Sequence, residues 1–217
     1  MEKNSVKNKI EPLDRQRIAR VALGLIDAHG IDQLSMRKLG GELGVEAMAL
    51  YHHFRNKAEL LDGILDIVLE DVDAALTPDG TPLERMRRTF DALREIAISH
   101  PHAYLSMVSR RFRTPTALKF YEQLLGLFHE AGLSAEQSAR YYRMMANFTA
   151  GAGLAEVGSR AKQPDATPIV LEDFNRPDEF PHITAAMPYL RVSEIDGIYH
   201  AGMDILFAAL MVEQTQR

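Results

Sequence analysis

Hydroxyl and cationic side chains gather in one short segment near the amino terminus, in a pattern suited to a polyanion. Ser35 stands where a helix is expected to begin, and Tyr51, Arg55 and Lys57 follow it closely. Hydroxyls, cations and the free amide groups of a helix start are common protein partners of phosphate oxygens. Arg37 adds a planar guanidinium that can donate to both acceptors of a guanine edge. These residues therefore predict contacts with nucleic-acid phosphates and, at Arg37, with a base.

Two short helices around a tight turn are expected to position these side chains. Ser35 can cap the first helix, and Gly44 stands where the chain needs a left-handed turn residue. The second helix is expected over Glu46–His53, with Leu50 and Phe54 facing inward. Such a pair, packed on a preceding helix, forms a helix-turn-helix whose second helix can enter a DNA major groove.

Two adjacent glycines, Gly40 and Gly41, lie inside the first helix of this pair. Glycine is a poor helix former, and in a helix interior it costs about 1 kcal/mol relative to alanine. We expect the small residues at these positions to let the two helices approach closely.

The outward face of the second helix is expected to offer apolar, acidic and imidazole side chains to a duplex: Glu46, Ala47, Met48, Ala49, His52 and His53. The small or apolar members can contact thymine methyl groups but cannot form bidentate hydrogen bonds. Arg37, His52 and His53 are therefore expected to be the main polar readers of base edges. The alternative is that the Tyr51 and Phe54 rings belong to the core and the two histidines are merely solvated.

Apolar residues recur at helical spacing along the rest of the chain, which predicts an all-α fold. Besides the pair, helices are expected over Leu13–His29, from Ala58 to the break at Thr77, and over Pro82–Ser99, Pro101–Arg111, Pro115–Ala131, Ser134–Arg160 and Ser193–Glu213. Ser134 and Gln137 fit a capping box. Ala161–Pro181 contains four prolines and is expected to be a mobile loop or to carry a short helix. We expect a flexible arm over 1–12, the helix-turn-helix domain over 13–60, and a helical bundle over 61–217.

Composition and charge limit the possible classes. With 46% hydrophobic and 25% charged residues, the 217-residue chain is globular rather than disordered. It has no cysteine, which excludes disulfides, thiolate metal sites and a cysteine nucleophile. Residues 1–60 contain ten Lys or Arg and eight Asp or Glu, whereas the remainder contains 15 and 22, so contact with a polyanion is expected only at the amino-terminal head. No apolar stretch is long enough to cross a bilayer, and we expect a soluble, cytoplasmic protein without a membrane partner.

Several short motifs in the first sixty residues resemble the DNA-binding domain of the TetR family of transcriptional regulators. The shared features are His29-Gly30 at a helix end, the helix start Ser35–Leu39, the turn Leu43–Val45, the segment Leu50–Phe54 and the helix start Asn56–Leu61. More loosely, Tyr199–Leu206 is similar to the effector-binding domain of the tetracycline-repressor branch. The resemblance implies a homodimeric repressor that a small, largely apolar effector releases from a palindromic operator in double-stranded DNA. An effector-independent regulator or an activator of the same fold is the alternative.

The family resemblance also implies residues for a dimer interface and an effector pocket in the carboxy-terminal bundle. Late helices of two subunits would meet through Gly151, Gly153, Ile198, Tyr199, Met203, Leu206 and Leu210. The pocket candidates are Phe90, Tyr104, Met107, Phe112, Phe120, Leu124, Phe128, Met144, Asn147, Phe148 and Thr149. Packing of these same residues within a single chain is the alternative in both cases.

Neither a cofactor nor a metal site is expected. Aligned through Ala131–Ser134, the metal-binding histidine of the tetracycline sensors falls near Val108, where this chain has no histidine. His100 and His102 flank a proline and are expected to end one helix and begin the next. The chain also lacks a His-Glu-x-x-His motif, a phosphate-binding glycine loop and a nucleophile elbow, so we do not expect an enzyme.

Overall fold

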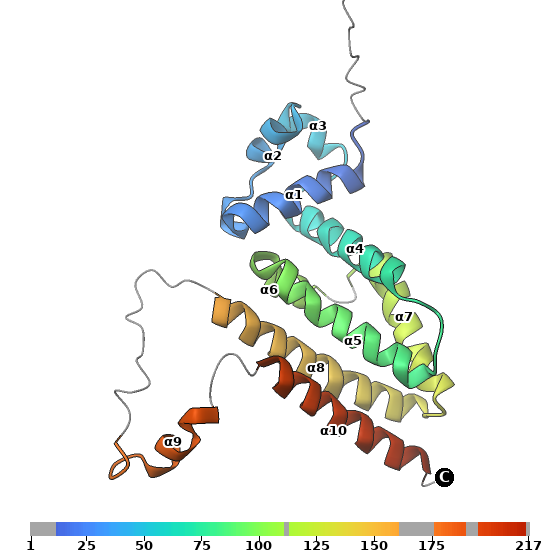
Figure 1. Cartoon of the computed structure of the whole chain (residues 1–217). Helices are drawn as coiled ribbons and strands as arrows, with labels where there is room; N and C mark the ends of the chain where they lie inside the picture. Colours follow the sequence, from blue (N-terminus) through green and yellow to red (C-terminus); the bar gives the residue numbers. More distant parts are fainter. Residues whose placement is uncertain (1–11, 111–112, 161–175, 190–194, 216–217) are drawn as a thin grey trace, which may run out of the picture.

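The structure, a computed structural model, describes residues 12–110, 113–160, 176–189 and 195–215. Within these residues it contains helices and turns but no strand, which confirms the all-α prediction (Figure 1). The helices are α1 (Arg15–His29), α2 (Met36–Leu43), α3 (Ala47–Tyr51), α4 (Lys57–Ala75), α5 (Pro82–Ser99), α6 (Pro101–Val108), α7 (Pro115–Glu130), α8 (Ala135–Arg160), α9 (Pro181–Ala186) and α10 (Ile195–Thr215). Most of the expected arm and of the proline-containing segment lies outside the described residues.

The first three helices form a small head at one end of the molecule (Figure 1). Local hydrogen bonds set their ends: the side chain of Asp14 accepts from the amide of Arg17, and that of Ser35 accepts from the amide of Lys38. Gly44 ends α2 with a φ of 69°, in the left-handed region where glycine is favoured. The expected cap at Ser35 and the expected turn at Gly44 are therefore confirmed. Helix α3 is shorter than predicted, because it ends at Tyr51 and the two histidines lie in the turn that follows.

Gly40 is the point at which α2 and α3 come closest. A Cβ atom on Gly40 would lie 2.7 Å from the carbonyl oxygen of Val45 and 3.3 Å from the amide nitrogen of Ala47. Gly41 is exposed, and a Cβ there would meet nothing within 4 Å. The prediction that small residues allow close approach therefore holds for Gly40 and is wrong for Gly41.

Helix α4 connects the head to a larger helical body. Its Leu60 and Ile64 are buried in one continuous core that also contains Ile18 and Phe54 of the head. Farther along, α4 packs against α5, α6 and α7, while α8 packs against α5 and carries α10 on its other side (Figure 1). The expected domain division at position 60 falls inside α4, and the division into two domains stays a prediction.

Helix α8 begins with the reciprocal hydrogen bonds that its sequence predicts. The Ser134 amide donates to Oε1 of Gln137 at 2.9 Å, and the Gln137 amide donates to Oγ of Ser134 at 3.2 Å. A capping box of this kind satisfies two amide groups that have no partner within the helix. It therefore helps to fix the start of the longest helix.

The two glycines of α2 provide a direct test of this packing. We expect Gly40→Ala to lower the free energy of unfolding by about 1–3 kcal/mol, because backbone atoms cannot move aside cheaply. Gly41→Ala should leave stability unchanged or raise it by up to about 1 kcal/mol, since alanine is the better helix former. Urea unfolding followed by circular dichroism measures both. Equal effects of the two substitutions would contradict the close contact at Gly40.

Candidate nucleic-acid interface and ligand cavity

The outer face of α3 is open to solvent. Met48 is 70% exposed and Tyr51 is 43% exposed, whereas Leu50 and Phe54 are buried beneath them. The other side chains predicted to face a DNA duplex, which we call the reading face together with Met48, are exposed or half-buried: Glu46, Ala47, Ala49, His52 and His53. The Tyr51 ring therefore does not belong to the core, while Phe54 does. The structure leaves this face free to meet a large partner.

The other predicted contact residues lie at the two ends of the helix pair. Ser35 and Arg37 are exposed at the start of α2, and Arg55 and Lys57 are exposed after α3. Lys57 also has a role within the head, because its Nζ donates to the carbonyl oxygen of Ile31 at 2.8 Å. The structure thus presents all four side chains at the surface, and their contacts with nucleic acid stay predictions.

Arg15, which the sequence analysis did not predict as a functional residue, contacts the turn that follows α3. Its guanidinium donates to the carbonyl oxygen of His53, contacts Oε1 of Glu59 at 3.0 Å and lies 4.1 Å from the centre of the Phe54 ring. Glu59 also accepts from the amide of Arg55, and this bond, followed by that from Arg15, holds the pKa of the carboxyl below its usual value. No local pattern could reveal Arg15, because 38 residues separate it from His53.

Polar contacts join the two ends of α6 to α1 of the head and to the connecting helix α4. At its start, Nδ1 of His100 lies 2.8 Å from Oδ2 of Asp27 on α1. Just beyond its end, Nη1 of Arg110 donates to Oδ1 of Asp62 at 2.7 Å and to the carbonyl oxygen of Ala58 at 3.2 Å, both on α4. A movement of α6 would therefore be transmitted to the base of the head.

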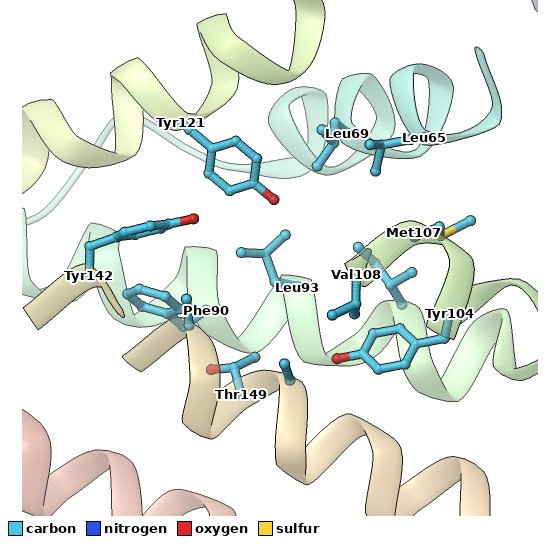
Figure 2. A pocket seen from close by; sticks show the side chains of 13 residues that line it. Leu65, Leu69, Phe90, Leu93, Tyr104, Met107, Val108, Tyr121, Tyr142 and Thr149 are labelled. Atoms are coloured by element: carbon cyan, nitrogen blue, oxygen red, sulfur yellow. The ribbon is translucent and has the colours of Figure 1, made fainter. Parts of the chain in front are cut away.

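A cavity lies next to α6 and is lined by residues of five helices of the body (Figure 2). It has a volume of about 50 Å³ and a largely apolar wall formed by Leu65, Leu69, Phe90, Leu93, Ile96, Tyr104, Met107, Val108, Tyr121, Tyr142, Ala146, Thr149 and Ala150. The wall therefore includes residues of α4 and α6, the two helices that carry the contacts described above. Because α4 and α6 also contact α1 of the head, a molecule that fills the cavity could affect the orientation of the head.

The cavity wall matches the predicted pocket in part. Four of the predicted residues line it: Phe90, Tyr104, Met107 and Thr149. Leu65 and Leu69 of α4 and Tyr121 and Tyr142 were missed, because an apolar stripe does not show which of its residues face a space.

The other predicted pocket residues lie elsewhere. Phe128 is completely buried in the core, and Phe148 stacks on Tyr199 with 5.9 Å between ring centres. Two more line a separate depression between α4, α5 and α7: Phe120 and Leu124. Two are exposed on α8: Met144 and Asn147. Phe112 lies outside the described residues. The described residues among these seven do not line this cavity, and their contact with an effector stays a prediction.

Helices α8 and α10 present adjoining exposed stripes, which we name the α8–α10 surface. On α8 the exposed positions recur every three or four residues: Met144, Asn147, Gly151, Leu154 and Gly158. On α10 they follow the same spacing: Ile198, Ala201, Ile205, Ala208 and Val212. This seven-residue repeat of mostly apolar or small side chains is typical of helices that pack against other helices.

The predicted interface residues fall on two sides of these helices. Gly151 and Ile198 are exposed on the α8–α10 surface, and Leu206 is half-buried. The other four are buried within the chain: Gly153, Tyr199, Met203 and Leu210. Gly153 faces α6, because a Cβ there would lie 2.3 Å from the Tyr104 hydroxyl. The prediction that these four contact a partner is therefore corrected: they hold α8, α10 and α6 together.

A buried arginine fastens α10 to the rest of the body. Arg94 of α5 contacts Glu156 of α8 and Asp196 of α10, and its guanidinium lies 4.5 Å from the centre of the Tyr199 ring. Burial raises the pKa of the Tyr199 hydroxyl above its usual value. The arginine thus joins three helices at one point, and the position of the α8–α10 surface depends on it.

Two further properties concern metals and membranes. Among the described residues, no group of three or more His, Cys, Asp or Glu side chains is placed to hold a metal ion. None of the described helices combines the length and hydropathy that a bilayer span requires.

Comparisons with known proteins agree with this architecture. The model for bacterial regulatory proteins of the tetR family matches residues 18–64, and that for the tetracyclin repressor-like C-terminal domain matches residues 74–213. The chain is 31% identical over 151 residues to the HTH-type transcriptional repressor DrrR1 of Streptomyces coeruleorubidus, covering 67% of this chain and 54%, about half, of that relative. It is 27% identical over 197 residues to the Escherichia coli tetracycline repressor protein class C, covering 90% and 85% of the two chains.

Solved structures show the same arrangement of helices. Apo ActR from Streptomyces coelicolor matches with a TM-score of 0.78 at 26% identity, over 94% of this chain and 98% of that one. ActR in complex with actinorhodin matches with a TM-score of 0.77. The chain belongs to the TetR family, as its motifs predicted, and it is a DNA-binding transcriptional regulator.

The contacts of Arg94 lead to a stability prediction. Arg94→Ala removes the cation that the buried Glu156 carboxylate contacts, and we expect a loss of about 3–5 kcal/mol in the free energy of unfolding. Arg113→Ala is the control, because that arginine is largely exposed while it pairs with Asp62, and it should cost about 1 kcal/mol or less. Urea unfolding at one fixed protein concentration measures both. A loss below about 1 kcal/mol for Arg94→Ala would contradict the stabilising role of its contacts with Glu156 and Asp196.

Proposed function

We propose that this regulator is a cytoplasmic homodimeric repressor, released from a palindromic operator when a small molecule fills the cavity. The open face of α3 carries the proposal, because its exposed side chains are supported from beneath by Leu50 and Phe54. Residues 13–60 would form the DNA-binding domain, and residues 61–217 would bind the effector and the second subunit. The relatives support this role: DrrR1 and the class C protein are named as repressors, and ActR binds actinorhodin.

On DNA, α3 would enter the major groove with Met48 at its centre. Ala47, Met48 and Ala49 would contact thymine methyl groups, while Arg37, His52 and His53 would reach polar base edges. Ser35, Tyr51, Arg55 and Lys57 would contact the phosphates on either side. Arg15 would hold the end of α3 in place without touching the duplex, through the carbonyl oxygen of His53.

A second copy of the chain would supply the other half of the interface. One short helix reads only a few base pairs, and two-fold dimers overcome this limit by placing their reading helices about 34–36 Å apart. The α8–α10 surface suits such a dimer, since it is apolar and lies at the end of the molecule away from α3 (Figure 1). Two copies joined there would leave both heads free.

Release from DNA would follow from the shared helices. A ligand that binds one arrangement of the cavity wall more tightly shifts the protein toward that arrangement. Because α4 and α6 line the cavity, such a shift would act through the Asp27–His100 and Asp62–Arg110 contacts on the base of the head. The spacing of the two α3 helices would then no longer match the operator.

The proposed contact of Arg37 with a base can be tested on DNA that the protein selects from a random pool. We expect Arg37→Ala to weaken binding about tenfold or more, because it removes a bidentate contact to guanine. Lys119→Ala removes an exposed cation on α7, which is not part of the helix-turn-helix, and should change affinity little. Mobility-shift titrations at one salt concentration measure both. Unchanged affinity of the Arg37 variant would rule out its assigned role.

The dimer can be tested by placing a charge on the α8–α10 surface. Ile205 is 69% exposed there, and Ile205→Asp should give monomers at micromolar concentration, because dimerisation would bury an unpaired carboxylate. Leu118→Asp is the matched control on α7, where the leucine is 53% exposed outside this surface. Sedimentation velocity distinguishes the two species. A wild-type monomer, or a dimer that persists in the Ile205→Asp variant, would refute the proposed interface.

A further inference from the structure

We propose that the cavity selects a neutral aromatic molecule of one or two fused rings that carries hydroxyl or carbonyl oxygens at its edge. This inference rests on the proposed function, in which the cavity is the effector site. It is drawn from three properties of the cavity wall: its charge, its hydroxyl groups and its aromatic rings.

The wall carries no charge among the residues that the structure describes there. A charged ligand would lose its hydration without gaining an ionic partner, which is strongly unfavourable in an apolar site. Arg94 lies on the same helix as Phe90 and Leu93, but Glu156 and Asp196 already occupy its guanidinium. The cavity should therefore exclude anions and cations.

Hydroxyl groups from three helices face the cavity. They belong to Tyr104 on α6, Tyr121 on α7 and Tyr142 on α8, whereas the hydroxyl of Thr149, which also lines the cavity, interacts with that of Tyr199. In Figure 2 the three tyrosine hydroxyls point toward the space between the helices. A hydroxyl has one donor and two acceptor positions, so it can bond a ligand in addition to a partner in the protein. A pure hydrocarbon would leave this capacity unused, whereas oxygens at the edge of a ring would satisfy it.

Aromatic rings form much of the rest of the wall. Tyr121 and Tyr142 meet edge to face, with 5.9 Å between their ring centres and 68° between their planes. Phe90 and Tyr104 lie on the neighbouring helices α5 and α6. Flat aromatic ligands pack well against such rings, in stacked or edge-to-face arrangements. The small volume of about 50 Å³ favours a thin molecule that only slightly separates the helices.

Three probes on one ring system test the proposal on the full-length chain: 2-naphthol, naphthalene and naphthalene-2-sulfonate. 2-Naphthol is neutral and has a hydroxyl, naphthalene is neutral and has none, and naphthalene-2-sulfonate is an anion. The chain contains no tryptophan, so the fluorescence of the probes can be followed with little protein background. We expect 2-naphthol to bind several-fold, up to about tenfold, more tightly than naphthalene, as one or two net hydrogen bonds allow. The sulfonate should bind at least about tenfold more weakly than 2-naphthol.

Variants locate the binding and identify the hydroxyls. Tyr121→Phe and Tyr142→Phe each keep the ring and remove one hydroxyl, so at least one of them should lose most of the preference for 2-naphthol over naphthalene. Tyr189→Phe is the control, because that tyrosine is 77% exposed and does not line the cavity. Circular dichroism shows that each variant is folded.

Each result decides the question. Equal binding of the sulfonate, no preference for 2-naphthol, or an undiminished preference in both cavity variants would overturn the proposal, as would the failure of all three probes to bind. The same preparations are assayed on DNA selected from a random pool. If the protein binds this DNA but not 2-naphthol, only the proposed ligand class is refuted. If it binds no DNA, the proposed function is refuted.

Discussion

A single helix, α4, serves both the DNA-binding head and the cavity, and the rest of the structure depends on this sharing. Leu60 and Ile64 are buried near the head, while Leu65 and Leu69 form part of the cavity wall. Helices are stiff and packed interiors resist compression, so a displacement on one side of α4 cannot be absorbed before it reaches the other. Communication between the two sites therefore needs no special pathway beyond the packing of one element.

Helix α6 adds a second connection between the cavity and the head, through contacts at its two ends. Its ends are held to α1 and α4 by partly buried polar contacts, His100 with Asp27 and Arg110 with Asp62, whereas its middle faces the cavity through Tyr104 and Met107. Charge-assisted hydrogen bonds are stronger and more dependent on geometry than apolar contacts, which tolerate small slides. A displacement of α6 from inside the cavity would thus act at one defined point on α1 of the head and one on α4.

The sequence predicted best where a local signal decides the structure. The cap at Ser35 and the left-handed Gly44 depend on neighbours a few residues away, and both were predicted correctly. Helix α10 was harder, because both of its faces are apolar: Tyr199 and Met203 face the chain while Ile198 and Ile205 face solvent. Periodicity finds such a helix but cannot tell its two faces apart. Long-range contacts such as Arg15 with His53 leave no local signal at all.

If the cavity is the effector site, as proposed, its small volume has a consequence for release from DNA. Ligand sites usually enclose several hundred Å³, whereas about 50 Å³ is open here, so a ligand of even modest size must separate helices. A ligand can shift an equilibrium only by the difference between its affinities for the two arrangements. A cavity that already fitted its ligand would bind it without moving α4 or α6. Under the proposed function, incomplete space in the cavity would therefore convert binding free energy into movement of the head.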